Sequence, residues 1–223
     1  MSLTQSAELP LFRGENGWNL FKTNPLRFVH GKHVAECFSE WGEYSIVAAI
    51  QAEQRFQSRL ERLFQDHFAL PPLNEVEPPV EEDLAIALLA PEHFAALVVP
   101  CGVVLHGRSF TQEIRASALR ALKARFGEDL FALAVTNADL ASTSTVLTDL
   151  DELERAVQLD GEACIAAWLA AQPTSLAAWL RLKATDEPVY SRALSTDLLQ
   201  RGPAIVRRIA PHVQAYATVR KAS

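Results

Sequence analysis

Alanine and leucine account for 64 of the 223 residues, whereas glycine occurs only nine times. Both residues enter a helix at little cost in free energy, and the sequence shows neither strand-like alternation nor an internal repeat of about 20 to 50 residues. It therefore predicts an all-α fold, a single irregular globular domain of about eight helices. A chain of this length can form one core without a metal or a disulfide.

The remaining composition is that of an ordinary globular protein, with 49% hydrophobic residues, 22% charged residues and a net charge of −6. These values argue against a disordered chain or a basic protein that binds nucleic acid. The cysteines Cys37, Cys101 and Cys164 are widely spaced and odd in number, which favours a reducing compartment. Residues 1–10 lack the features of a secretory signal peptide, so a cytoplasmic protein is expected.

The longest uncharged stretch, residues 163–180, approaches the length of a membrane span. Pro173, Thr174 and Ser175 in its middle are typical of a helix end followed by a new N-cap. Two helices, each too short to cross a hydrocarbon core of about 30 Å, explain this stretch better. We therefore expect no integral membrane segment.

Composition also predicts the domain organisation. Residues 1–25 carry scattered glycine, asparagine and proline, which predicts a loosely structured N-terminal arm that docks through Trp18, Leu20 and Phe21. The helical domain is expected over 26–223. It is interrupted at about 70–83, where four prolines and five acidic residues within fourteen positions predict a surface loop.

Periodicity and capping signals place the helices of the first half. An amphipathic helix is predicted over about 43–68. Ser109 and Gln112 match a capping box, which predicts a helix from there to Gly127. Arg115 falls on the apolar side of this helix, where it either extends its charge past the core or pairs with a carboxylate.

The second half continues with a predicted helix over about 127–140 and a longer one whose acidic first turn begins at Asp149. Thr174 is predicted to cap the next short helix. Gly202-Pro203 indicates that one helix ends and another begins, and Pro211 predicts a break or kink in the last one.

The nearest match to a metal site is His30-x-x-His33-x-x-x-Cys37, whose side chains would approach one another at helical spacing. A structural zinc needs four ligands, and the sequence supplies no CxxC or HExxH to complete the set, so a pair of partly exposed polar histidines is the favoured interpretation. His106 lies near Ser109 in sequence, but a catalytic histidine also needs an orienting acid, and proximity in sequence rarely makes a triad. Glycine-rich phosphate loops are absent. We expect no enzymatic activity and no cofactor.

Charge is distributed unevenly along the chain. Residues 201–223 contain five basic residues and no acidic one, so removing them from the total of −6 leaves −11 for residues 1–200. Such an end is suited to anionic lipid headgroups or an acidic protein surface, although a solvated helix face is the more frequent outcome. Nucleic acid is not expected, since no aromatic residues alternate with these charges.

Three short motifs, in order and with similar spacing over about 25–185, resemble the SctK family of type III secretion proteins, which includes YscK and PscK. The first is Leu26-Arg27-Phe28. The second is Gly102-Val-Val-Leu-His-Gly107, followed by Ala116-Ser-Ala-Leu119. The third is Ala167-Trp-Leu-Ala-Ala171, followed by Trp179 and Arg181-Leu182.

The resemblance implies a non-catalytic, all-helical adaptor of the cytoplasmic sorting platform. Such an adaptor links the pods built by SctQ and SctL to the cytoplasmic domain of the inner-membrane ring protein SctD. We expect its partner contacts near the most family-like segment, at His106, Arg108, Arg120 and Lys123. Two alternatives are another helical secretion chaperone or regulator, and a metal-binding enzyme built around His30, His33 and Cys37.

Overall fold

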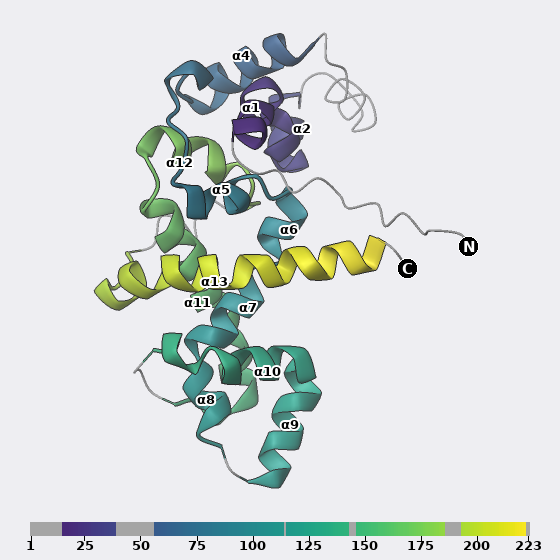
Figure 1. Cartoon of the computed structure of the whole chain (residues 1–223), viewed down its shortest axis with the longest axis vertical. Coiled ribbons are helices and arrows are strands. Elements are labelled where there is room, and N and C mark those ends of the chain that lie inside the picture. Colours follow the sequence, from purple (N-terminus) through teal and green to yellow (C-terminus); the bar gives the residue numbers. More distant parts are fainter. Residues whose placement is uncertain (1–14, 39–55, 114, 143–145, 186–192, 222–223) are drawn as a thin grey trace, which may run out of the picture.

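Helices form all the regular structure of the described residues, which are 15–38, 56–113, 115–142, 146–185 and 193–221 of a computed structural model. The prediction of an all-α fold is confirmed (Figure 1). In chain order the elements are α1 (Glu15–Thr23), the 3-10 helix η1 (Pro25–Phe28), α2 (Gly31–Cys37), α4 (Gln57–Phe68), the 3-10 helix η3 (Leu73–Glu75), α5 (Glu81–Ala87), α6 (Pro91–Ala95), α7 (Val98–Leu105), α8 (Gly107–Thr111), α9 (Ala116–Phe126), α10 (Glu128–Thr136), the 3-10 helix η4 (Ala138–Leu140), α11 (Leu150–Ala170), α12 (Thr174–Arg181) and α13 (Thr196–Lys221).

The centre of the fold is formed by α7, α11 and α13, and glycines lie where α11 packs against α7 and against α13. A Cβ atom on Gly102 of α7 would lie 1.8 Å from the carbonyl oxygen of Val157, and one on Gly161 of α11 would lie 2.0 Å from that of Val98. Glycine is therefore required at both positions for the backbones of α7 and α11 to approach so closely.

Two hydrophobic clusters lie on either side of this centre. The larger one gathers the N-terminal helices, α12 and parts of α7, α11 and α13, and its largest buried side chains include Trp168 and Trp179. The smaller one holds together a lobe made of α8, α9 and α10, which lies at the opposite end of the molecule from α1, α2 and α4 (Figure 1). Its buried residues are Val103, Phe110, Leu122, Ala134, Leu153 and Val157.

A buried polar network ties α5, α11 and α13 together. The Asp83 carboxylate accepts hydrogen bonds from the indole of Trp168 at 2.8 Å, from the Gln172 amide at 2.9 Å and from the Arg207 guanidinium at 2.7 and 2.8 Å. Burial acts to raise the pKa of Asp83, but these donors together hold it below its usual value. The carboxylate is therefore fully satisfied although its side chain is buried.

The prediction that a helix ends at Gly202-Pro203 is wrong, because α13 continues through both Pro203 and Pro211. Gly202 lies where α13 presses on α11, and a Cβ there would come within 2.7 Å of the Ala167 side chain and 3.1 Å of the Cys164 carbonyl oxygen. This glycine permits close packing rather than ending the helix, so tertiary contacts override the local signal.

The predicted capping box is also wrong. α8 ends at Thr111 and a new helix, α9, begins at Ala116, so Ser109 lies inside α8. Arg115 is the N-cap residue of α9, and its guanidinium pairs with Glu113 at 2.6 Å, which settles its two predicted alternatives in favour of a carboxylate. The helix end at Gly127 is confirmed, and its φ of 88° explains the preference for glycine.

The N-terminal arm departs from the prediction of loose structure, since residues 15–23 form α1. Trp18 and Phe21 are buried and Leu20 packs against the same cluster, which agrees with the predicted docking of these three residues.

The proline-rich segment is an irregular connection with one short 3-10 helix until α5 begins at Glu81. It is held more firmly than a surface loop, because Leu70, Leu73 and Val76 are buried. Residues 1–14 and the first part of the helix predicted over 43–68 lie outside the described residues.

Other predicted boundaries agree with the structure. Asp149 caps α11, its carboxylate accepting a hydrogen bond from the Glu152 amide at 2.8 Å. Two helices, α11 and α12, cover the uncharged stretch at 163–180, although Pro173 rather than Thr174 is the N-cap residue of α12. Within the described ranges, no single helix has both the length and the apolar composition of a membrane span. The helical segments Glu81–Ala87 and Pro91–Leu105 have the required length and apolar composition only when taken together, and the chain bends by 111° between them.

Candidate functional site

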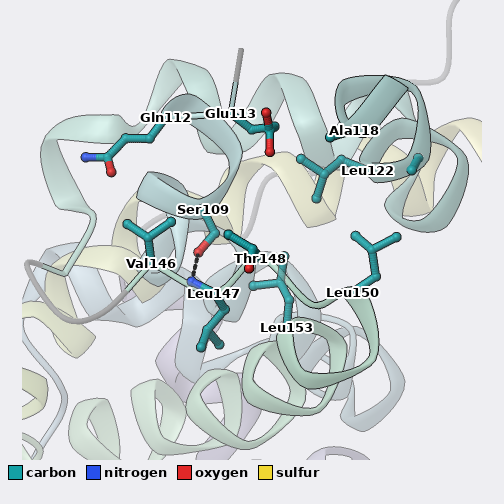
Figure 2. A pocket seen from close by; sticks show the side chains of 11 residues that line it. Ser109, Gln112, Glu113, Ala118, Leu122, Val146, Leu147, Thr148, Leu150 and Leu153 are labelled. Carbon is teal, nitrogen blue, oxygen red and sulfur yellow. Dashed lines mark hydrogen bonds between the residues drawn. The ribbon is translucent and has the colours of Figure 1, made fainter. Parts of the chain in front are cut away.

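The lobe formed by α8, α9 and α10 carries the four residues predicted to contact partners, and a groove runs beside them. The groove has a volume of about 310 Å³ and lies between α8, α9 and the start of α11 (Figure 2). Its apolar side chains include Ala118, Ala121 and Leu122 of α9 and Leu150 and Leu153 of α11.

Ser109 holds one wall of this groove in place. Its hydroxyl oxygen accepts a hydrogen bond from the backbone amide of Leu147 at 2.9 Å, which fixes the segment before α11 against α8 (Figure 2). The Arg125 guanidinium donates to Glu154 at 2.9 Å and to Asp151 at 2.6 Å, which links α9 to the first turns of α11. Polar contacts therefore join the elements that form the groove.

Removing the Ser109 hydroxyl tests this account of the wall. Ser109→Ala leaves the Leu147 amide without its acceptor, which is expected to lower the free energy of unfolding by about 1–2 kcal/mol. Chemical denaturation measures the loss. The exposed Ser117→Ala on α9 serves as the control and should change stability by less than about 0.5 kcal/mol; equal effects for the two variants would contradict the structural role of Ser109.

The four predicted contact residues lie in two different environments. His106 is only 8% exposed, and its Nε2 lies 2.8 Å from the Asp160 carboxylate, so it joins the end of α7 to α11. Arg108 is half-buried; with the Gln112 amide turned to present its oxygen, Arg108 donates to it at 2.9 and 3.0 Å. Both side chains therefore make contacts inside the molecule, His106 with α11 and Arg108 within the lobe.

Arg120 and Lys123 lie on the side of α9 that faces away from the groove, since each is about 150° around the helix from the middle of the arc that carries Ala118, Ala121 and Leu122. The Arg120 side chain is exposed and donates to the Ala116 carbonyl oxygen at 3.2 Å. The Lys123 ammonium is 2.9 Å from Glu128 and 5.1 Å from the ring centre of Phe131, both on α10. We call the exposed side that carries Arg120 and Lys123 the basic face of α9.

The possible metal ligands at 30–37 are not arranged around a common point. His30 is the N-cap residue of α2 and accepts from the Lys32 amide, whereas the buried His33 ring contacts the Ala184 carbonyl at 2.7 Å and Glu36 at 3.2 Å. Burial raises the pKa of the Cys37 thiol to about 11, an effect that Glu36 strengthens, and this disfavours the thiolate that binds zinc. No group of three ligand side chains that could hold a metal occurs among the described residues.

The basic C-terminal end is partly neutralised within the molecule. Arg201 pairs with Asp197 at 2.6 Å, Arg207 with Asp83, and Arg208 with Asp139 at 3.6 Å. The contacts of Arg207 and Arg208 attach α13 to the rest of the fold, whereas the pair of Arg201 and Asp197 lies within α13. The side chains of the remaining basic residues, at 220 and 221, lie outside those that the structure describes.

Comparisons with protein-family models, curated proteins and solved structures find no match to this chain. The residues that carry the resemblance to the SctK family are mostly internal: Leu26 and Phe28 are buried, as are Trp168 and Trp179. The segment 101–107 is buried as well, and Gly102 in it makes the close contact with α11. Most residues of these motifs therefore pack the helices together and do not form a partner-binding surface.

Proposed function

We propose that this chain is a non-catalytic adaptor of a type III secretion sorting platform. The observation that carries the proposal is the ordered series of three SctK-like motifs. The helical fold and the internal positions of the motifs support it, because a shared scaffold is preserved by the residues that pack helices together. In this role the protein is cytoplasmic and peripheral to the inner membrane.

An adaptor needs separate surfaces for its two partners, and the lobe of α8, α9 and α10 offers two. One is the groove, which is suited to an apolar side chain or the apolar side of a helix. The other is the basic face of α9, which is suited to an acidic surface. We propose that the SctQ-type pod protein, alone or together with SctL, and the cytoplasmic domain of the SctD-type ring protein each use one of these two surfaces.

Two sets of variants test these surfaces separately. Ala121→Arg places a long charged side chain in the groove, and Arg120→Glu with Lys123→Glu reverses the charge of the basic face. Each change is expected to weaken binding of one partner by at least tenfold, as measured by titration calorimetry with the purified SctQ-type protein and the SctD-type cytoplasmic domain from the same genome.

The exposed Ala132→Arg on α10 is the matched control for the groove variant and should bind both partners as the unaltered chain does. Circular dichroism establishes that each variant remains helical. Undiminished binding of both partners by both sets of variants would eliminate these surfaces, whereas no binding of either partner by the unaltered chain would contradict the proposed function itself.

A further inference from the structure

A second pocket, which shares no lining residue with the groove, lies where four segments of the chain meet. It has a volume of about 590 Å³ and is lined by residues around η1 and the start of α2, by α6 and α7, by α11, and by residues 183–185. This volume lies within the usual range of small-molecule sites. Phe94, Val98 and Ile165 provide an apolar wall, and Arg27, Glu92 and Lys183 bring charge to the pocket.

Lys183 is the unusual group in this lining, because its side chain is almost fully buried, with 1% exposed. Its ammonium donates one hydrogen bond, 2.6 Å long, to the carbonyl oxygen of Leu89. It also lies 4.8 Å from the ring centre of Phe28 and 5.9 Å from that of Phe94. An ammonium has three N–H donors, so this buried group has more donors than the described residues satisfy with acceptors.

The charges near Lys183 do not compensate its burial. Desolvation lowers the pKa of Lys183 to about 7, and the attraction of Glu92 opposes this only in part. The other ionisable groups at the pocket are Arg27 from η1, His30 before α2, and Glu162 of α11, which accepts a hydrogen bond from Gln158 at 2.6 Å. An anionic group entering the pocket would supply the missing acceptors and the missing counter-charge.

The shape and charge of the lining restrict the ligand further. The apolar wall calls for a hydrocarbon body that replaces water there. Glu92 and Glu162 would repel a ligand with several negative charges, which favours a single carboxylate directed towards Lys183 and Arg27. We propose that this pocket binds a small monocarboxylate with an apolar body, whose carboxylate accepts hydrogen bonds from the Lys183 ammonium. This inference is independent of the proposed adaptor role.

Benzoate is a suitable probe, and calorimetric titration into the full chain tests the proposal. We expect saturable binding with a Kd of about 1 mM or tighter at pH 7.5. Because only the protonated amine pairs with the carboxylate, binding should take up about 0.7 proton per benzoate, measured from the heats in buffers of different ionisation enthalpy. Benzamide, which has the same shape without the charge, should bind at least tenfold more weakly.

Lys183→Met should weaken benzoate binding at least tenfold and abolish the proton uptake. Lys123→Met, which removes the same charge far from the pocket, should bind as the unaltered chain does. Equal binding of benzamide and benzoate would overturn the proposal without need of any variant. If an N-acetylated tripeptide with a free C-terminus binds and benzoate does not, the pocket recognises a chain end instead of a small ligand.

Discussion

Replacing Gly102 with alanine is expected to lower the free energy of unfolding by about 3 kcal/mol or more, because the new methyl group would overlap the Val157 carbonyl. Both atoms belong to or adjoin helix backbones, so no side chain can turn aside to relieve the overlap. α7 and α11 would have to separate, and the packing of both hydrophobic clusters would loosen with them. Urea denaturation measures the effect as a lower midpoint.

Gly107→Ala is the matched control for this prediction. A Cβ at Gly107 would lie 3.2 Å from the Ala141 side chain, a contact that a shift of a few tenths of an ångström relieves. Its effect should therefore be well below that of Gly102→Ala. Comparable stability of the unaltered chain and Gly102→Ala would show that α7 and α11 do not approach at this glycine.

Lys183→Met is expected to make the protein more stable at pH 7, and by an amount that shrinks as the pH rises. Burial holds the pKa of Lys183 at about 7, whereas the ordinary pKa of a lysine is 10.5, so the unfolded chain binds one more proton than the folded chain between these two pH values. The cost of burying the ammonium is therefore largest below pH 7 and is relieved as the pH rises towards 10.5. Methionine fills a similar volume without this cost.

The difference in the free energy of unfolding between Lys183→Met and the unaltered chain should decrease by about 3 kcal/mol between pH 7 and 9.5. Denaturation at a series of pH values measures it, and the difference between two variants removes the contribution of groups that titrate in both. Lys123→Met, at a partly exposed lysine, should show no such trend. A difference that is constant with pH would mean that Lys183 is not buried as a destabilised cation.

The sequence correctly predicted those helix ends that are determined by residues at the end itself. Asp149 caps α11 with its own side chain, and Gly127 ends α9 through its own backbone conformation. The sequence around Gly202 is equally typical of a helix end, and that around Ser109 of a helix start. In the structure both residues instead make contacts with distant segments, Gly202 with α11 and Ser109 with Leu147. Where tertiary packing decides the role of a residue, its immediate neighbours in sequence cannot reveal it.

The same distinction applies to the candidate sites. Helical periodicity correctly placed Arg120 and Lys123 away from the apolar side of α9, but it gave no sign that Lys123 reaches across to Glu128 and Phe131. The burial of Lys183 was not predicted because Leu89, Phe28 and Phe94, which surround its ammonium, come from three other segments. Asp83 lies in an acidic run typical of an exposed segment, and only the fold brings Trp168 and Arg207 to it.

The adaptor role is tested most directly by affinity purification of the tagged full chain from its source cells after gentle lysis, followed by mass spectrometry. We expect SctQ-, SctL- or SctD-type proteins of the same genome to be recovered with it in stoichiometric amounts, and we expect Ala121→Arg or the reversed basic face to remove one of them. Recovery of none of these proteins, while the SctQ- and SctL-type proteins copurify with each other from the same lysate, would contradict it.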